Sequence, residues 1–407
     1  MNLLSAKTHL HKKESPLCDS VLRLIWREKQ TSRAAIARQM GLSRSTVSEI
    51  IDDLLKTGLV AEVGSGKSSG GRRPIVLEFQ DEAHCILGVD LGATHVSVAL
   101  TDMRGNVMVW KEQKHPVRTD PEGTRALVMR LCDECLDKWG KGREKLIRIG
   151  VAVPSPVDPL NPKMLSEVVI PAWQGKSGLE ELQNRYKVPV HVDNDANLGA
   201  LAEHWWGAGL GIDNFIYIKI AHGIGAGYVL NGEVYRGAGG VAGELGHLPI
   251  DPDGELCVCG VKGCLATFVS IPALTERAKN LSVNYPNSKL SVDVLNFDLV
   301  EKAAMDKDEL ALVLVSEVAE HLGRALVGWF NLMNPNLAIV GGGLSGLGEL
   351  LLKPIRDKVK NYTLVSKAAV DIKTGELGPR TVAIGAATLA LEAMFSGSDL
   401  SRINNKA

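Results

Sequence analysis

The chain has 407 residues, of which 45% are hydrophobic and 23% are charged, a composition typical of a soluble globular protein. This length exceeds what one hydrophobic core usually accommodates, so we expect two or three domains. No apolar run approaches the roughly 18 residues of a membrane-spanning helix, and the charged N-terminus lacks a signal-peptide core. The sequence therefore predicts a cytoplasmic protein that does not bind a membrane.

Charge is distributed unevenly along the chain. The net charge is −1, yet residues 1–80 contain 13 Lys and Arg against 8 Asp and Glu. Excess positive charge favours contact with nucleic acid, whose backbone is anionic. The N-terminal segment is therefore the first place to look for a DNA-binding element.

The N-terminal segment predicts a helix-turn-helix. Residues 1–19 lack a hydrophobic period and are expected to form a flexible arm, and the folded domain is expected over 20–80. After a first helix, Thr31 or Ser32 is expected to cap a second helix, and Ser43 is expected to cap a third. In this motif, the first residues of the last helix enter the major groove of DNA.

A hairpin follows the three helices. Residues 59–63 and 75–79 alternate between apolar and polar side chains, and a loop rich in Gly and Ser joins them, as in the wing of a winged helix. The alternative interpretation is a unit of three packed helices that does not bind nucleic acid. The hairpin, and the two arginines at its base, favour DNA binding. The candidate DNA-contacting residues are Arg44, Ser45, Thr46, Ser48, Arg72 and Arg73.

The pattern changes to α/β near residue 86, and several apolar strands run directly into turns rich in Gly or Asp. The backbone N–H groups of such turns can approach a phosphate closely. We expect Gly223, Gly225 and Gly227 to form one tight turn of this kind. Ordinary hairpin turns also favour Asp and Gly, so each motif alone is weak evidence for a phosphate site. The candidate phosphate- or nucleotide-binding residues are Asp90, Gly92, Thr94, Gly223, Gly225, Gly341, Gly342 and Gly343.

A polar segment, Asp193-Asn194-Asp195-Ala-Asn197, ends the predicted strand over 188–192. Carboxylates at the C-terminal edge of a parallel sheet are where α/β folds hold their ligands. In a sugar kinase, Asp195 would accept the proton of a sugar hydroxyl. The alternative is that Asn and Asp only cap a helix that begins at Leu198.

Four residues have the spacing of a metal site. His247, Cys257, Cys259 and Cys264 follow the pattern H-x9-C-x-C-x4-C between glycines, and such Cys3His sets hold structural zinc in tetrahedral geometry. Cys132 and Cys135 form a second C-x-x-C, but no further Cys or His pair lies near them in the sequence. We interpret those two thiols as packing residues of an amphipathic helix.

Together these motifs resemble the ROK family of bacterial sugar-responsive repressors and sugar kinases. The most specific match is G-E-L-G-H ending at His247, followed by C-V-C-G-V-K-G-C over 257–264. The resemblance implies a winged helix followed by a two-lobed actin-like, ribonuclease H-like domain over 86–395. It also implies a zinc-binding loop over 244–264. Residues 396–407 look frayed in the sequence and are expected to form a disordered tail.

The resemblance also implies roles for individual residues. Asn194, Asp195, Glu244 and His247 would bind sugar hydroxyls in a pocket between the lobes, and His247 would hold zinc through its other ring nitrogen. The protein would be a cytoplasmic homodimer or homotetramer.

Three departures from the family pattern bear on activity. Ala266 lies where the kinases usually have a Glu that binds sugar, and Ser155 follows Pro154 where the family tends to have Gly. Ala93 replaces a second Gly in the first phosphate turn, and His95 follows Thr94. A lost hydroxyl–carboxylate bond is worth about 1.5–3 kcal/mol, enough to weaken or redirect sugar recognition without abolishing it.

Two hypotheses of different class follow. The first is a DNA-binding transcriptional regulator, expected to be a repressor of carbohydrate genes, that binds double-stranded operator DNA and a monosaccharide or sugar-phosphate effector. The second is a sugar kinase, or a bifunctional kinase and regulator, that uses Mg2+–ATP with Asp195 as catalytic base. A zinc enzyme is disfavoured, because four protein ligands leave no open coordination position.

Overall fold

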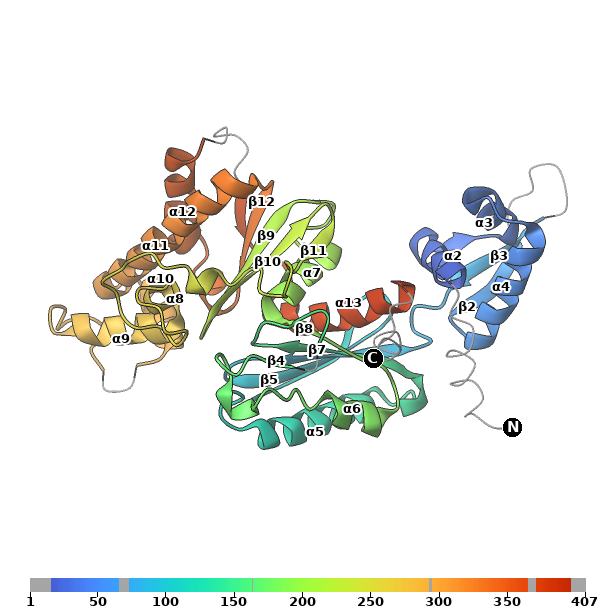
Figure 1. Cartoon of the computed structure of the whole chain (residues 1–407), viewed down its shortest axis with the longest axis horizontal. Coiled ribbons are helices and arrows are strands. Elements are labelled where there is room, and N and C mark those ends of the chain that lie inside the picture. Colours follow the sequence, from blue (N-terminus) through green and yellow to red (C-terminus); the bar gives the residue numbers. More distant parts are fainter. Residues whose placement is uncertain (1–15, 66–72, 163, 293–294, 365–370, 397–407) are drawn as a thin grey trace.

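The computed structural model describes residues 16–65, 73–162, 164–292, 295–364 and 371–396. Figure 1 shows three bodies: a small N-terminal domain on the right and two α/β lobes, each built on a five-stranded sheet. The small domain is called the head below. Residues 1–15 of the predicted arm and residues 397–407 of the predicted tail lie outside the described residues. Ser396, which was expected to begin the tail, is instead the last residue of a helix.

The head is a winged helix, as predicted. Its helices pack on a three-stranded sheet of order β1-β3-β2, with Val47, Ile51 and Leu54 buried between them. The first helix begins at Pro16, so residues 16–19 are helical and the prediction of an arm up to residue 19 was wrong. The elements are α2 (Pro16–Glu28), β1 (Gln30–Thr31), α3 (Arg33–Met40), α4 (Arg44–Thr57), β2 (Val60–Ser65) and β3 (Ile75–Phe79).

Side-chain caps fix the helix-turn-helix. The Ser32 hydroxyl accepts a hydrogen bond from Ala35 N at 3.2 Å, and the Ser43 hydroxyl accepts one from Thr46 N at 3.1 Å. Each bond satisfies a backbone donor that the helix leaves free. Gly41 ends α3 with a φ of +66°, a left-handed conformation that glycine adopts without strain.

The first lobe has the strand order β6-β5-β4-β7-β8. Strand β4 pairs in parallel with β7, and β7 in parallel with β8, so their C-terminal ends share one edge of the sheet. Helices α5 and α6 cover the outer face (Figure 1). The elements are β4 (Cys85–Leu91), β5 (His95–Thr101), β6 (Val107–Lys114), α5 (Pro121–Trp139), β7 (Leu146–Val153), α6 (Leu179–Tyr186) and β8 (Val190–Asn194).

The second lobe has the order β11-β10-β9-β12-β13, and a large apolar cluster joins this sheet to the helices on its outer side. Among these helices, α11 is the longest. The elements are β9 (Phe215–Ile220), β10 (Ile224–Leu230), β11 (Glu233–Tyr235), α8 (Ala266–Val269), α9 (Ile271–Ser282), α10 (Phe297–Met305), α11 (Glu309–Met333), β12 (Leu337–Gly341), α12 (Glu349–Tyr362) and β13 (Asp371–Thr374).

Helices α7 (Asp195–Trp206) and α13 (Thr381–Ser396) lie between the two sheets (Figure 1). They approach their neighbours unusually closely. A Cβ on Gly150 of β7 would lie 1.7 Å from Ala386 O of α13, and one on Gly385 would lie 1.8 Å from Leu198 O of α7. Backbone-to-backbone contact at these points requires glycine.

Two local predictions differ from the structure. The helix expected from Leu198 begins at Asp195, one residue after its cap Asn194, so Asp195 belongs to its first turn. Gly225 and Gly227 do not belong to a tight turn, because β10 already begins at Ile224. Gly227 faces α7, where an added Cβ would lie 2.4 Å from Ala196 O.

Within the described residues, the helices are all too short or too polar to traverse a lipid bilayer.

The close contact of β7 with α13 yields a stability prediction. We expect Gly150→Ala to lower the free energy of unfolding by about 1–3 kcal/mol, because the new methyl group meets the backbone of α13. Gly239→Ala is the matched control, since its Cβ would meet nothing within 4 Å. Denaturant unfolding of both variants measures the difference, and equal midpoints would contradict the packing argument.

Candidate functional site

Asn194 joins β8 to α7. Its Oδ1 accepts hydrogen bonds from Ala196 N at 2.9 Å and Asn197 N at 3.2 Å, and its Nδ2 donates to Ser155 O at 3.2 Å. Asn194 therefore caps the helix, which starts three residues earlier than expected. The amide fixes the start of α7 and ties it to the loop after β7.

Asp195 carries an ion pair that the sequence analysis did not predict. Lys219 Nζ of β9 lies 2.7 Å from Asp195 Oδ2, and the two side chains are only 13% and 14% exposed. Burial lowers the pKa of Lys219, but the charges of Asp195 and Asp90 outweigh it and raise that pKa above the usual value. The ammonium group holds the Asp195 carboxylate in position and competes for the oxygen that a catalytic base would use.

Asp90 is also paired with a cation. His95 Nε2 lies 3.3 Å from Asp90 Oδ2, and a Cβ on Gly92 would lie 2.2 Å from the His95 ring. Burial raises the pKa of Asp90. The charge of Lys219 and the hydrogen bond with His95 lower that pKa by more, so the net shift is downward. The first turn predicted to bind phosphate is therefore covered by His95, while Thr94 beside it is exposed.

Asp90 keeps one free acceptor. Its Oδ1 is buried and has no hydrogen-bond donor among the described residues. The carboxylate can therefore still accept a bond from water or from a ligand.

Glu244 and His247 lie on the loop that follows β11. Burial, and to a smaller extent the charge of Asp195, raises the pKa of Glu244 to about 7. His247 Nε2 lies 3.9 Å from Glu244 Oε2, while its Nδ1 faces the sulfur of Cys257 at 3.5 Å. The two ring nitrogens therefore point to different partners. The charge of Asp195 reaches Glu244, so these predicted sugar-binding residues lie in one region.

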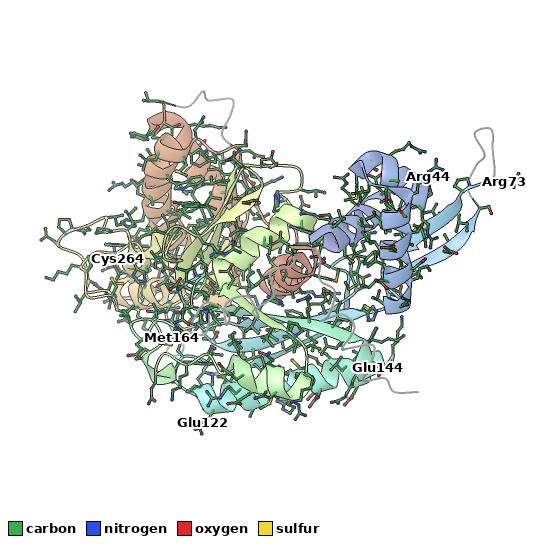
Figure 2. All side chains as sticks on the ribbon, turned by 45° about the vertical axis from the view of Figure 1, so that its right-hand side comes forward. Arg44, Arg73, Glu122, Glu144, Met164 and Cys264 are labelled. Atoms are coloured by element: carbon green, nitrogen blue, oxygen red, sulfur yellow. The ribbon has the colours of Figure 1, made fainter. Side chains whose placement is uncertain are left out.

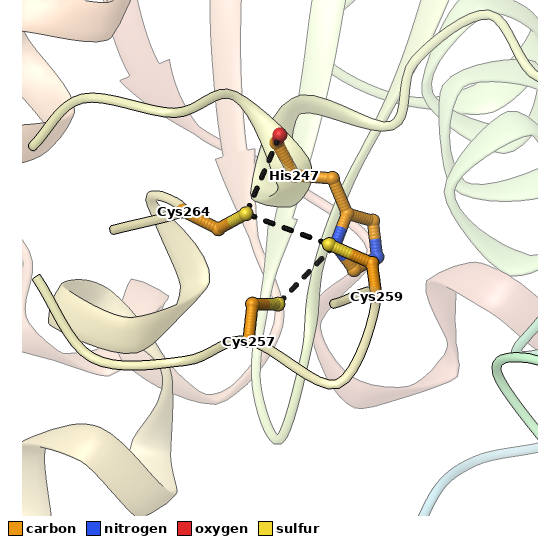
Figure 3. Close-up of side chains that lie close together, drawn as sticks. All are labelled: His247, Cys257, Cys259 and Cys264. Atoms are coloured by element: carbon orange, nitrogen blue, oxygen red, sulfur yellow. Dashed lines mark hydrogen bonds between the residues drawn. The ribbon is translucent and has the colours of Figure 1, made fainter. Parts of the chain in front are cut away.

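The four predicted metal ligands form a cluster (Figure 3). One ligand atom from each residue lies within 4.8 Å of the others. Cys259 Sγ lies 3.6 Å from Cys264 Sγ, and short bridges between Pro249 and Cys264 and between Leu256 and Lys262 hold the loop together. The arrangement can hold a metal ion.

Two of the residues that depart from the family pattern, Ser155 and Ala266, have surroundings that the structure describes. The buried Ser155 hydroxyl donates to Pro156 O at 3.1 Å and accepts a bond from Ser166 N at 3.0 Å, so it fastens its own loop. Ala266 is the first residue of α8 and offers no polar group there.

Packing accounts for two of the glycines in the last predicted phosphate loop. A Cβ on Gly341 would lie 2.2 Å from the Tyr217 hydroxyl, and one on Gly342 would lie 2.5 Å from Ile220 O. Gly342 also has a φ of +79°. Gly343 opens a short 3-10 turn over Gly343–Leu347. These glycines let β12 pack against β9 whether or not a nucleotide binds.

The predicted DNA-contacting residues lie on the head. Arg44 and Arg73 are exposed, and Figure 2 shows both on the part of the head away from the lobes. The Ser43 hydroxyl lies 2.8 Å from both the Ser45 and the Thr46 hydroxyls. Ser48 is half-buried, and Arg72 lies outside the described residues.

The sequence analysis missed Lys219 and Arg236. Arg236 Nε donates to Asp193 Oδ2 at 2.7 Å, and Asn197 Nδ2 donates to Asp193 Oδ1 at 3.2 Å, so the segment before α7 is fastened from two sides. A lysine inside the otherwise apolar strand Phe215–Ile220 was a usable signal for Lys219. Arg236 gave no such signal, because its partner is distant in the sequence.

Comparison with known proteins separates the chain into the same parts. The ROK family model matches residues 86–393, and the MarR family model matches residues 20–62. The xylose repressor of Caldicellulosiruptor bescii is 30% identical over 92% of this chain and 95% of that protein. The DNA-binding transcriptional dual regulator NagC of Escherichia coli K12 is 32% identical over 93% of each chain.

Solved structures agree with this division. A ROK family transcriptional regulator described as a homolog of the E. coli MLC protein has a TM-score of 0.79 at 25% identity, covering 96% of this chain and 98% of that one. A ROK glucokinase from Streptomyces griseus, in complex with glucose and AMPPNP, has a TM-score of 0.68 at 29% identity over 76% of this chain and 99% of its own. From the family match over most of its length and these full-length relatives, we conclude that the chain belongs to the ROK family.

Proposed function

We propose that the protein is a sugar-responsive transcriptional repressor in which Asn194, Asp195, Glu244 and His247 bind the sugar. The observation that carries the proposal is the course of α7. This helix begins at Asp195, beside the candidate sugar-binding residues, and ends at Trp205 and Trp206, which contact the head. One rigid element therefore touches both the ligand site and the DNA-binding domain.

The contact with the head is aromatic. The Trp26 ring of α2 lies 5.5 Å from the Trp205 ring, 6.3 Å from the Trp206 ring and 5.4 Å from the Phe395 ring of α13. Trp26 Nε1 also donates to Met103 O at 2.8 Å. Aromatic pairs at these spacings add about 0.5–1.5 kcal/mol each to the burial of their surface.

Arg104 closes this contact from the first lobe. Its guanidinium lies 4.4 Å from the centre of the Trp26 ring, its Nη2 donates to Trp26 O at 2.7 Å, and its Nε donates to Asp81 Oδ1 at 2.7 Å. Asp81 lies in the segment that joins the head to β4. We call Trp26, Arg104, Trp205, Trp206 and Phe395 the head–lobe cluster.

The two tryptophans of α7 are also bonded to α13. Trp205 Nε1 donates to Glu392 Oε1 at 2.9 Å, and Trp206 Nε1 donates to Thr388 Oγ1 at 2.8 Å. Movement of α7 therefore carries α13 and the head with it. A sugar that prefers one arrangement of the lobes will shift the population of head positions. If the chain assembles as a homodimer or homotetramer, that shift changes the distance between two heads on an operator.

Removal of Arg104 should uncouple the head from the lobes. We expect Arg104→Ala to retain operator and ligand affinity but to lose most of the ligand's effect on operator binding. Titration of a selected operator with and without ligand measures this, and Arg130→Ala, an exposed arginine of α5, is the control. An undiminished ligand effect in Arg104→Ala would contradict the coupling route.

The exposed arginines of the head should differ in their effect on DNA binding. We expect Arg44→Ala to cost about 1–3 kcal/mol and to relax sequence preference, because this residue begins the helix expected in the major groove. Arg73→Ala should weaken binding to all sequences and reduce the salt slope by about one, as expected for a phosphate contact. Operator titrations at several salt concentrations test both, with Arg130→Ala again as the control.

We propose zinc as the ion of the Cys3His cluster. In a tetrahedral zinc site with bonds of about 2.3 Å to sulfur, the sulfurs lie about 3.8 Å apart. The Cys259–Cys264 distance of 3.6 Å fits this geometry. His247 Nδ1 would bind the ion, which leaves Nε2 beside Glu244 for a sugar hydroxyl.

Loss of a zinc ligand should destabilise the second lobe. We expect Cys259→Ser to lower the zinc content below one per chain and the melting temperature by about 5 °C or more. Lys262→Ala, an exposed residue of the same loop, should change neither. Elemental analysis and thermal unfolding measure the two quantities, and an unchanged melting temperature after zinc loss would refute the structural role.

A sugar kinase is the second candidate, and the similarity to the glucokinase favours its fold. The ion pair of Asp195 with Lys219 argues against its chemistry, because the ammonium group already occupies the carboxylate oxygen that would receive the proton. The regulator therefore accounts for more of the structure.

A further inference from the structure

The head is bonded to the rest of the chain at a second place, apart from the head–lobe cluster. His84 lies in the segment between β3 and β4, and its Nε2 lies 3.0 Å from Thr57 O, the carbonyl oxygen of the last residue of α4. Because a carbonyl oxygen only accepts, Nε2 carries the hydrogen and donates it. The helix expected in the major groove is therefore held at its C-terminal end by the residue that precedes β4.

Helix capping is the simpler interpretation of this bond, since the last carbonyl groups of a helix have no partner within it. Helix α4 already has caps of its own, however. Gly58 ends it with a φ of +75° and donates its N–H to Leu55 O at 3.2 Å, and the Thr57 hydroxyl donates to Leu54 O at 2.6 Å. The bond of His84 therefore adds a connection between two parts of the molecule.

The segment that carries His84 is fixed on both sides. Gln80 N donates to Leu59 O of the head at 2.8 Å, and Met103 N of the first lobe donates to Asp81 O at 3.0 Å. Strand β4, which follows His84, pairs with β5 and β7 in the middle of its sheet, and all seven of its residues are buried. His84 therefore moves with the first lobe.

Two separate contacts fix an orientation that one contact leaves free. The head–lobe cluster holds the head at Trp26, and a body held at one place can turn about it. The bond of His84 holds the same body at the end of α4. Helix α4 has 14 residues and spans about 20 Å, so a turn of about 10° at Thr57 moves Arg44 by about 3 Å. That displacement is as long as a hydrogen bond and would separate Arg44 from a base.

We propose that His84 is a positioning residue for operator recognition: it is the second anchor of the head and sets the angle at which α4 meets DNA. This role rests on the proposed function, because a ligand acts through the anchor only if the chain is a ligand-responsive repressor. A small shift of α7 relative to β4 moves one anchor against the other and turns the head. Without the bond of His84, the head stays attached through Trp26 and Arg104 but takes a range of angles.

Distances between the head and the first lobe test the anchor without ligand or DNA. Nitroxide labels on p-acetylphenylalanine at the exposed positions Glu49 of α4 and Arg130 of α5 leave every cysteine of the full-length, zinc-containing protein unmodified. Pulsed electron resonance should give a distance distribution about two-fold wider in His84→Phe, which keeps a ring without a donor, than in the wild type. His84→Gln restores an N–H donor and should restore the width.

The matched control is Glu82→Gln, an exposed neighbour in the same segment that should leave the width unchanged. His84→Leu replaces His84→Phe if the latter does not fold. Equal widths in all variants would overturn the anchor. A lower melting temperature of His84→Phe without a wider distribution would overturn it too, since His84 would then only cap α4.

Operator titrations connect the anchor to regulation. Glucose, xylose, glucose 6-phosphate and xylose 5-phosphate are the probes, and the one that changes the operator affinity of the wild type most is used. Its effect should fall about five-fold or more in His84→Phe and return in His84→Gln. An undiminished effect in His84→Phe would overturn the proposal even if the distances widen. If no probe changes the operator affinity of the wild type, the distance distributions alone decide the matter.

Operator binding by the wild type keeps this test separate from the proposed function. If the wild type binds no DNA while the head–lobe distances depend on His84, the repressor proposal fails and the second anchor stands. If a sugar changes operator binding while neither the distances nor that change depends on His84, the anchor fails and the repressor proposal stands.

Discussion

The close packing of α7 between α13 and the two sheets is the constraint on which the rest of the molecule depends. An added Cβ on Gly385 would lie 1.8 Å from Leu198 O, and one on Gly227 would lie 2.4 Å from Ala196 O. Interiors packed at this density transmit displacement instead of absorbing it. The buried Glu203 adds a polar tie, since it accepts bonds from Glu376 N and Leu377 N just before α13. Because α7 cannot shift alone, an event at its first residue reaches its last.

Local chemistry explains which parts of the fold could be predicted from the sequence. Ser32 and Ser43 cap their helices because the signal for a cap lies within four residues of it. The strand at Ile75–Phe79 followed from alternation alone. The prediction of a tight turn at Gly225 and Gly227 was wrong, because contacts between distant parts of the chain explain these glycines. Both belong to strand β10, and Gly227 faces α7. A sequence pattern shows that a side chain is missing but not which neighbour requires its absence.

The candidate site also has residues that could be predicted from the sequence and contacts that could not. The metal cluster could be predicted because its four ligands lie within 18 consecutive residues and have characteristic spacing. The partners of Asp195 and Asp193 could not, because Lys219 and Arg236 are brought to them by the packing of the second lobe on α7. Trp26 and Trp205 are 179 positions apart in the sequence and meet only in the folded chain.

The free energy that a ligand can supply is comparable with that of the Arg104 contact between the head and the lobes. A ligand that binds one arrangement a hundred-fold more tightly than the other shifts the equilibrium by about 2.7 kcal/mol. The cation–π contact of Arg104 with Trp26 contributes about 0.5–2 kcal/mol, and its two hydrogen bonds contribute about 0.5–1.5 kcal/mol each. The contribution of Arg104 to the contact that holds the head is therefore of the same size as the free energy that one ligand supplies. Loss of this one side chain can then shift the balance between head positions as far as a ligand does, although the aromatic part of the contact remains.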